Sequence, residues 1–242
     1  MVSNSMNQKI INILKLGRFF FVFGGLFLFL VGALFAVLTG AELDINKILI
    51  GYLILFLGHL SVSYSNDYFD YKKKTDNEDR LGPARAVSSG WIDPGMMLVG
   101  IFVTITVACL FGMGLIWYGG WEMIIVGIVC VVSLLAYTAG PWPLAYNGLG
   151  DVFVLVFFGF VAVIFSNYVQ THLITPQAFI CGGAVGLAAV NILILNNYRD
   201  RETDKKSNKK TTIVIFGEKF GRRFYLINGL ISKTYVIIIQ LK

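Results

Sequence analysis

The chain has 242 residues, of which 56% are hydrophobic and only 14% are charged. This composition is typical of a polytopic membrane protein and excludes a sizeable soluble domain. The net charge of +6 does not indicate a nucleic-acid partner, because most basic residues lie in short loops between hydrophobic segments, where positive charge records orientation in the membrane.

Seven hydrophobic segments are long enough to cross a bilayer, since about 20 apolar residues span a hydrocarbon core about 30 Å thick. They lie at roughly 17–38, 47–65, 95–118, 121–139, 151–169, 177–195 and 223–240. The sequence therefore predicts an all-α fold, in which about seven transmembrane helices form one bundle over residues 1–242. Gly182 and Gly186 form a GxxxG pair within one of these segments, and such pairs let helix backbones approach closely.

Basic residues are distributed unevenly between the two sets of connecting loops. If the N-terminus lies in the cytoplasm, lysines 72–74, Arg85 and the basic loop 199–223 all lie there too. The loops on the opposite side contain a single Lys or Arg, which is Lys47. Because cytoplasmic loops are enriched in Lys and Arg, we predict a multi-pass protein of the cytoplasmic membrane with this orientation. The predicted cytoplasmic connections are 66–93, 140–150 and 196–222.

The first of these connections begins with an acidic run, "NDYFDYKKKTDNEDR", at the end of the second predicted span. Its pattern N-D-x-x-D-x-x-x-x-x-D is formed by Asn66, Asp67, Asp70 and Asp76. If the helix continues through this end, the first three of these side chains lie on one face. His59 and Ser63 extend the same stripe into the span. An ionisable residue in a span is a functional candidate by default, but we favour a packing role for His59.

The third connection begins with "NNYRDRETDKKSNKKT", which repeats this logic. Asn196 and Asn197 lie one helical turn before Asp200, and Asp200 lies one turn before Asp204. Like charges this close repel each other unless a positive charge lies between them. The segment therefore predicts a second helix face that carries two carboxylates and binds a cation.

Two carboxylate faces opposed across a cavity would hold Mg²⁺ ions with a diphosphate between them. Mg²⁺ takes oxygen ligands and commonly binds through one or two carboxylates and the phosphates of a substrate. Arg85 and Arg199 could add bidentate contacts to phosphate oxygens, with lysines as point charges. Alternatively, each acidic run is a solvated loop; their shared membrane side and helical phase favour the metal site. The predicted ligands are Asp67, Asp70, Asp76, Asp200 and Asp204.

These two runs resemble the two aspartate-rich motifs of the UbiA superfamily of membrane prenyltransferases. The resemblance is closest to the branch that prenylates 1,4-dihydroxy-2-naphthoate in menaquinone biosynthesis. Three details favour that branch: the long interval from Asp70 to Asp76, the continuation "DRLGPARAV", and the segment "YTAGPWPLAYNGLGDVFVLVFFGFVAV". The resemblance runs from about Asn7 to Lys219.

The resemblance implies a helical bundle around a central cavity that is open to membrane lipid. A polyprenyl diphosphate would lie there with its head on Mg²⁺ and its tail in the apolar interior. The enzyme would join that tail to 1,4-dihydroxy-2-naphthoate, which loses its carboxyl group and gives demethylmenaquinone. The catalytic residues would be Asp67, Asp70, Asp200 and Asp204. The substrate-binding residues would be Asn66, Arg85, Tyr137, Tyr146, Asn196, Asn197, Tyr198, Arg199 and Lys205.

Ionisation of the diphosphate leaves an allylic cation, which aromatic rings beside the motifs could shield through their faces. The aromatic residues concerned are Tyr64, Tyr68, Phe69, Tyr137, Tyr146 and Tyr198. The tyrosines among them could equally serve as interfacial anchors, since aromatic belts lie at the same depth in the membrane.

Members of the superfamily usually have nine transmembrane helices, so the resemblance implies that this chain is short at its C-terminus. Three alternatives stay open: a prenyltransferase with another aromatic or lipid acceptor, a truncated member without catalysis, and a secondary transporter. The transporter is disfavoured because the acids cluster at the ends of spans, whereas transporters bind their substrates near the bilayer midplane.

Overall fold

The computed structural model describes residues 30–75 and 81–240, and every regular element within them is a helix. Residues 30–38 are helical at the start of the described chain. The elements that follow are α3 (Ile45–Lys72), α4 (Pro94–Gly119), α5 (Glu122–Thr138), the short η1 (Leu144–Tyr146), α6 (Gly150–Val154), the π-helical η2 (Leu155–Val161), α7 (Ala162–Thr171), α8 (Pro176–Lys206), α9 (Thr212–Phe216) and α10 (Glu218–Gln240). The prediction of an all-helical membrane bundle is confirmed.

Three of the long helices begin at a side chain that caps their free N–H groups. Asp44 accepts hydrogen bonds from two backbone N–H groups at the start of α3, and Asp93 does the same for α4. Thr175 caps α8. Proline follows directly at Pro94 and Pro176, where its missing N–H costs nothing and its fixed φ favours the first helical turn.

Four helical segments among the described residues are long and apolar enough to cross a membrane: α3, α4, the continuous run Gly150–Thr171, and α8. Helix α5 is apolar but shorter. These five coincide with five of the seven predicted spans. The predicted span 223–240 falls on α10, which is helical but is not among these apolar segments. The predicted span 17–38 lies mostly outside the described residues. The chain is thus a multi-pass membrane protein.

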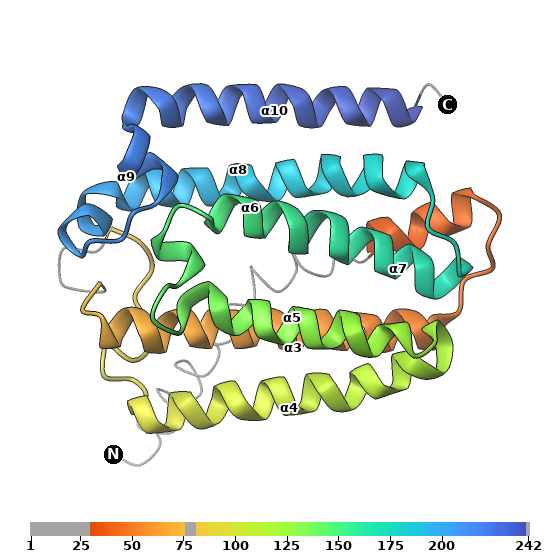
Figure 1. The fold of residues 1–242 in the computed structure, drawn as a ribbon, viewed down its shortest axis with the longest axis horizontal. Coiled ribbons are helices and arrows are strands. Elements are labelled where there is room, and N and C mark those ends of the chain that lie inside the picture. Colours follow the sequence, from red (N-terminus) through yellow and green to blue (C-terminus); the bar gives the residue numbers. More distant parts are fainter. Residues whose placement is uncertain (1–29, 76–80, 241–242) are drawn as a thin grey trace, which may run out of the picture.

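The helices lie side by side, with α10 packed on α8 at one edge and α4 packed on α3 at the other (Figure 1). Because consecutive long helices run in opposite directions, the loops that follow α3, α5 and α8 gather at one end of the bundle. Contacts tie these loops together: Lys73 Nζ lies 3.4 Å from the carbonyl oxygen of Thr138, and Lys210 N donates to the carbonyl oxygen of Tyr146 at 3.1 Å.

Helix α8 and the π-helical segment η2 pack with their backbones almost in contact. A Cβ atom placed on Gly186 would lie 2.8 Å from the carbonyl oxygen of Leu155, and one placed on Gly159 would lie 2.5 Å from that of Gly182. Neither distance is tolerated by a real side chain, so glycine is required. The predicted role of the Gly182 and Gly186 pair in close helix packing is confirmed, and it fixes α8 beside the central cavity.

Candidate active site

A cavity of about 890 Å³ lies between α3, α5, the α6–η2 segment and α8. Its body is lined mainly by apolar side chains, among them Phe153, Phe158, Ile192 and Leu193. Its polar lining includes residues from the ends of α3 and α8, where the two aspartate motifs lie. A cavity of this form offers an apolar chain and a charged head group two distinct environments.

Helix α3 sends one polar stripe into this cavity. His59, Ser63, Asn66 and Asp70 all line it, and they share a face because α3 continues to Lys72. The predicted continuation of the helix through the acidic run is therefore confirmed. Asn66 and Asp70 are one turn apart at the loop end of the stripe.

Asp70 is buried and surrounded by donors from three other segments. The Tyr146 hydroxyl donates to its Oδ1 at 2.6 Å, and Nη2 of Arg85 lies 3.4 Å from its Oδ2. Nζ of Lys209 lies 3.8 Å from the same oxygen. The side chain of Asp70 is only 2% exposed, so these cations compensate a charge that water cannot solvate.

Asp67 points elsewhere, although it belongs to the same motif. Its two oxygens accept hydrogen bonds from the backbone N–H groups of Ala86 at 2.9 Å and Val87 at 3.1 Å. Asp67 is buried but is not among the residues that line the cavity. In this geometry it fixes the loop after α3, and so it positions Arg85, the residue next to Ala86.

Helix α8 lines the opposite side of the cavity with the second motif. The lining residues here are Asn196, Asn197, Arg199, Asp200 and Asp204. Asp200 receives two hydrogen bonds from the guanidinium of Arg199, both at 2.7 Å. Asp204 is buried, and its Oδ1 lies 3.8 Å from Nζ of Lys209.

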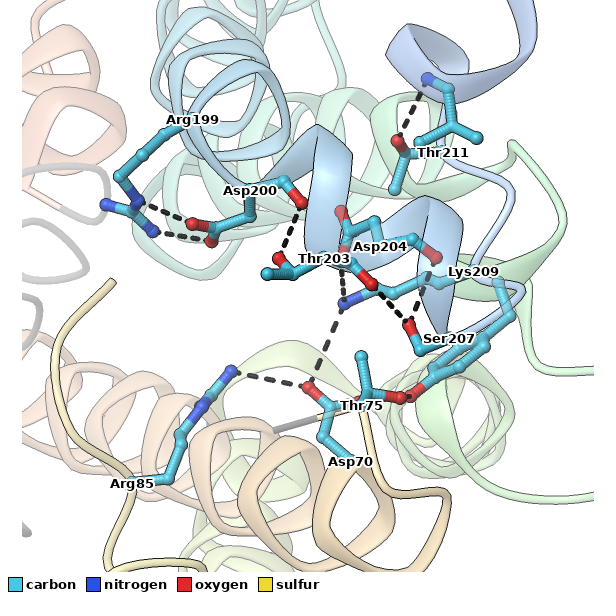
Figure 2. A network of polar contacts seen from close by, with 12 residues as sticks. Asp70, Thr75, Arg85, Arg199, Asp200, Thr203, Asp204, Ser207, Lys209 and Thr211 are labelled. Carbon is cyan, nitrogen blue, oxygen red and sulfur yellow. Dashed lines mark hydrogen bonds and ion pairs between the residues drawn. The ribbon is translucent and has the colours of Figure 1, made fainter. Parts of the chain in front are cut away.

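Lys209 joins the two motifs, as Figure 2 shows. Its ammonium group lies 3.8 Å from an oxygen of Asp70 and 3.8 Å from an oxygen of Asp204, so these two carboxylates are no further apart than twice that distance. They face one shared space despite the long stretch of chain between them. Lys209 was not singled out by the sequence, because it is one of four lysines within six residues.

A second lysine lies on the loop side of this cluster. Nζ of Lys73 lies 4.0 Å from the centre of the Tyr146 ring, a cation–π contact. Burial lowers the pKa of Lys73; Asp70 opposes that shift and Lys209 adds to it. The hydroxyl of Tyr146 is also within 2.8 Å of Thr75 Oγ1, so Tyr146 connects the loop after α3 to Asp70.

The donor set fits a divalent cation that is completed by a substrate. Among the described residues, no three His, Cys, Asp or Glu side chains gather closely enough to hold a metal alone, and Asp76 lies outside those residues. Mg²⁺ commonly binds through one or two carboxylates and substrate phosphates, which Asp70, Asp200 and Asp204 can supply. The position of the Lys209 ammonium between Asp70 and Asp204 indicates that a cation is accommodated there.

The remaining predicted residues lie in different places. Tyr137 lines the cavity and packs on Phe153, with ring centres 4.7 Å apart. Tyr198 lies at the junction of α8 and α10, where its hydroxyl donates to Glu218 at 3.1 Å. Lys205 is exposed, and neither it nor Tyr198 lines the cavity. Asp151, which belongs to neither aspartate motif, also lines the cavity.

The chain is similar in sequence to known bacterial proteins. The 1,4-dihydroxy-2-naphthoate octaprenyltransferase of Escherichia coli (strain K12) is 35% identical over 167 residues, which are 66% of this chain and 54% of that protein. The protein of that name from Mycobacterium leprae (strain TN) is 32% identical over 195 residues, 81% of this chain and 65% of that protein. The chain thus spans between half and two thirds of the length of these relatives.

A solved structure of a UbiA homolog from Archaeoglobus fulgidus bound to DMAPP and Mg²⁺ has the same fold. The TM-score is 0.66 at 17% identity, and the match covers 94% of this chain and 77% of that one. The model of the UbiA prenyltransferase family matches residues 25–240. Because that match takes in almost all of the sequence, including both aspartate motifs, the chain belongs to the UbiA prenyltransferase family.

Proposed function

We propose that this protein transfers a polyprenyl group from polyprenyl diphosphate to 1,4-dihydroxy-2-naphthoate, with loss of the acceptor's carboxyl group, in a Mg²⁺-dependent reaction that gives demethylmenaquinone. Relatives from two distant bacteria carry the name of this activity. The observation that carries the proposal is the meeting of Asp70 and Asp204, from two separate motifs, around Lys209 in one cavity.

The charged end of the cavity suits the diphosphate. Mg²⁺ bound there would neutralise the negative charge that develops on the leaving group. Asp70, Asp200 and Asp204 would hold the ion. Arg85 and Lys209 line the same space and can bind phosphate oxygens directly. The Archaeoglobus fulgidus homolog, which was solved with DMAPP and Mg²⁺, supports this class of ligand.

The apolar body of the cavity suits the prenyl tail. Tyr137, Phe153 and Phe158 line it, and the faces of those rings that lie nearest the diphosphate would stabilise an allylic cation. Water is a competing nucleophile, so an apolar lining also protects the cation from hydrolysis. The loop end of the bundle would face the cytoplasm, as the excess of basic residues in these loops indicates.

The test is turnover by the purified full chain in detergent with Mg²⁺, a radiolabelled polyprenyl diphosphate, and 1,4-dihydroxy-2-naphthoate labelled in its carboxyl group. We expect prenylated product and an equal amount of labelled CO₂, and chelation of the metal should abolish both. Product from 4-hydroxybenzoate without product from 1,4-dihydroxy-2-naphthoate would assign another acceptor. Absence of product from either would contradict the proposed reaction.

A further inference from the structure

Asp151 is a buried carboxylate in the cavity wall that belongs to neither aspartate motif. It lies at the start of α6, is 5% exposed, and lines the same cavity as Asp70 and Asp204. Its Oδ2 accepts a hydrogen bond from Thr212 Oγ1 at 2.5 Å, whereas its Oδ1 is buried and has no hydrogen-bond partner among the described residues. A buried carboxylate oxygen without a donor is costly.

Two other polar atoms in the cavity wall are in the same condition. Oδ1 of Asn66 and Oγ1 of Thr138 are buried and find no hydrogen-bond partner within residues 30–75 and 81–240, and both residues line the cavity. Unpaired polar atoms of a native protein call for an explanation. Because these three come from α3, α5 and α6 and surround one cavity, a polar ligand that enters the cavity is the common explanation.

The electrostatic setting of Asp151 differs from that of the motif aspartates. Asp70, Asp200 and Asp204 each lie within 4 Å of a cationic side chain. No Lys or Arg of the described chain forms an ion pair with Asp151, whose partner is the hydroxyl of Thr212. A carboxylate without a cation repels phosphate and accepts hydrogen bonds from neutral donors, so Asp151 suits the acceptor and not the diphosphate.

We propose that Asp151 is a catalytic residue that binds a phenolic hydroxyl group of the aromatic acceptor through Oδ1 and takes up its proton during prenyl transfer. This inference rests on the proposed function. A phenol attacks an allylic cation faster as its hydroxyl proton is withdrawn, because the oxygen then donates more electron density to the ring. A positioned general base typically contributes about 10²- to 10⁴-fold to a rate.

The transfer needs no reactant other than the two substrates and Asp151. The C–O bond of the prenyl diphosphate breaks, and diphosphate leaves with the electron pair. A ring carbon of the acceptor forms the new C–C bond while the hydroxyl proton passes to Asp151. The bond from that carbon to the carboxylate then breaks, CO₂ leaves, and its electron pair restores the aromatic ring. The proton returns from Asp151 to the oxygen, so the carboxylate is regenerated.

The competing explanation is purely structural, since the bond to Thr212 attaches α6 to α9. Two variants separate the explanations. Asp151→Asn keeps an acceptor for Thr212 but turns its NH₂ group, a donor, toward the position of Oδ1. Thr212→Val removes the attachment and keeps the carboxylate. A structural role predicts similar losses in both variants, whereas a role in acceptor binding predicts a loss in Asp151→Asn alone.

The experiment measures the binding of two probes to the full chain: 1,4-dihydroxy-2-naphthoate and its dimethyl ether, which has no hydroxyl donor. We expect wild type and Thr212→Val to bind the hydroxyl form at least about tenfold more tightly, as hydrogen bonds to charged groups allow. In Asp151→Asn this preference should fall below about threefold. Turnover should fall at least about 100-fold in Asp151→Asn, while binding of Mg²⁺ with a non-reactive prenyl diphosphate analogue stays within about twofold.

Equal binding of both probes by the wild type, or an unchanged preference in Asp151→Asn, would overturn the inference even if the wild type prenylates the acceptor. Conversely, the protein could prefer the hydroxyl probe over the dimethyl ether through Asp151 and yet show no turnover. That result would contradict the proposed reaction but support Asp151 as part of the acceptor site. Equal losses of preference in Thr212→Val and Asp151→Asn would assign the pair a structural role.

Discussion

The ends of α3 and α8 carry the two aspartate motifs, and they use their carboxylates in parallel ways. In each motif one aspartate is bonded to a group other than Lys209: Asp67 to the backbone N–H groups of Ala86 and Val87, and Asp200 to its neighbour Arg199. The other, Asp70 or Asp204, reaches across to Lys209. The comparison teaches that membership of a motif does not give each aspartate the same task.

The two motifs also differ in how easily Asp67 and Asp200 can leave their present hydrogen-bond partners. Asp67 is buried and bonded to backbone N–H groups, which cannot move without displacing the loop. Asp200 is bonded to the flexible side chain of Arg199, which is partly exposed. Asp200 can therefore exchange its partner for a metal ion at a lower cost than Asp67.

The largest expected effect comes from the aspartates that reach across. Replacing Asp70 or Asp204 with Asn should lower turnover at least about 100-fold, because each change removes a charge that would hold the metal beside the leaving diphosphate. Titration calorimetry with Mg²⁺ and a non-reactive diphosphate analogue should show weakened binding. Glu202→Gln on the same helix is a matched control, since Glu202 is exposed. Equal turnover of Asp70→Asn and the control would contradict the shared site.

The next largest effect is expected at Lys209, which lies between the two motifs. Lys209→Met removes the ammonium between Asp70 and Asp204, and taking a cation away from buried carboxylates is destabilising. We expect the metal-free variant to unfold at a temperature several degrees lower than wild type, and Mg²⁺ to raise its midpoint by more than it raises that of wild type. An equal Mg²⁺-induced rise in both proteins would show that Lys209 and the metal do not share the site.

The sequence predicted the parts of this site that depend on local geometry. Helical spacing placed His59, Ser63, Asn66 and Asp70 on one stripe, because α3 continues without interruption past the acidic run. The same spacing placed Asp200 and Asp204 on one side of α8. Five of the seven hydrophobic segments coincide with apolar helices of the described chain, since a span needs a fixed length of apolar chain, although α3 and α8 continue beyond the predicted ends.

The parts of the site that depend on distant or irregular backbone could not be predicted from the sequence. Asp67 lies about 60° around the helix from Asp70, at 100° per residue, and its partners are backbone groups nineteen and twenty residues further along. Lys209 turns back to Asp204 because Asn208 adopts a left-handed φ of 59° and the N–H of Lys209 bonds the carbonyl of Asp204 at 2.8 Å. The sequence of four nearby lysines does not indicate which of them contacts Asp70 and Asp204.

A smaller effect on turnover, with a distinct effect on stability, is expected at Asp67. In Asp67→Asn one backbone N–H, of Ala86 or Val87, faces an NH₂ group and loses its acceptor, which costs about 1–3 kcal/mol for a buried donor. The unfolding midpoint in detergent should fall, while Mg²⁺ affinity should fall less than in Asp70→Asn. Asp67→Asn with Mg²⁺ affinity as low as that of Asp70→Asn would place Asp67 among the metal ligands after all.

The smallest effect is expected at Tyr198, which lies outside the cavity. Its hydroxyl donates to Glu218 and accepts from Nε of Arg222 at 3.0 Å, on the surface where α8 meets α10. Tyr198→Phe keeps the ring, which packs against Arg201, and removes only these two contacts, one part-buried and one exposed, and such contacts near the surface are individually weak. Turnover and prenyl diphosphate affinity should stay within about twofold of wild type, measured beside Tyr137→Phe, whose ring lines the cavity. A loss of diphosphate affinity in Tyr198→Phe would mean that the substrate extends beyond the cavity to the junction of α8 and α10. Residues of that junction would then bind substrate as well as hold the two helices together.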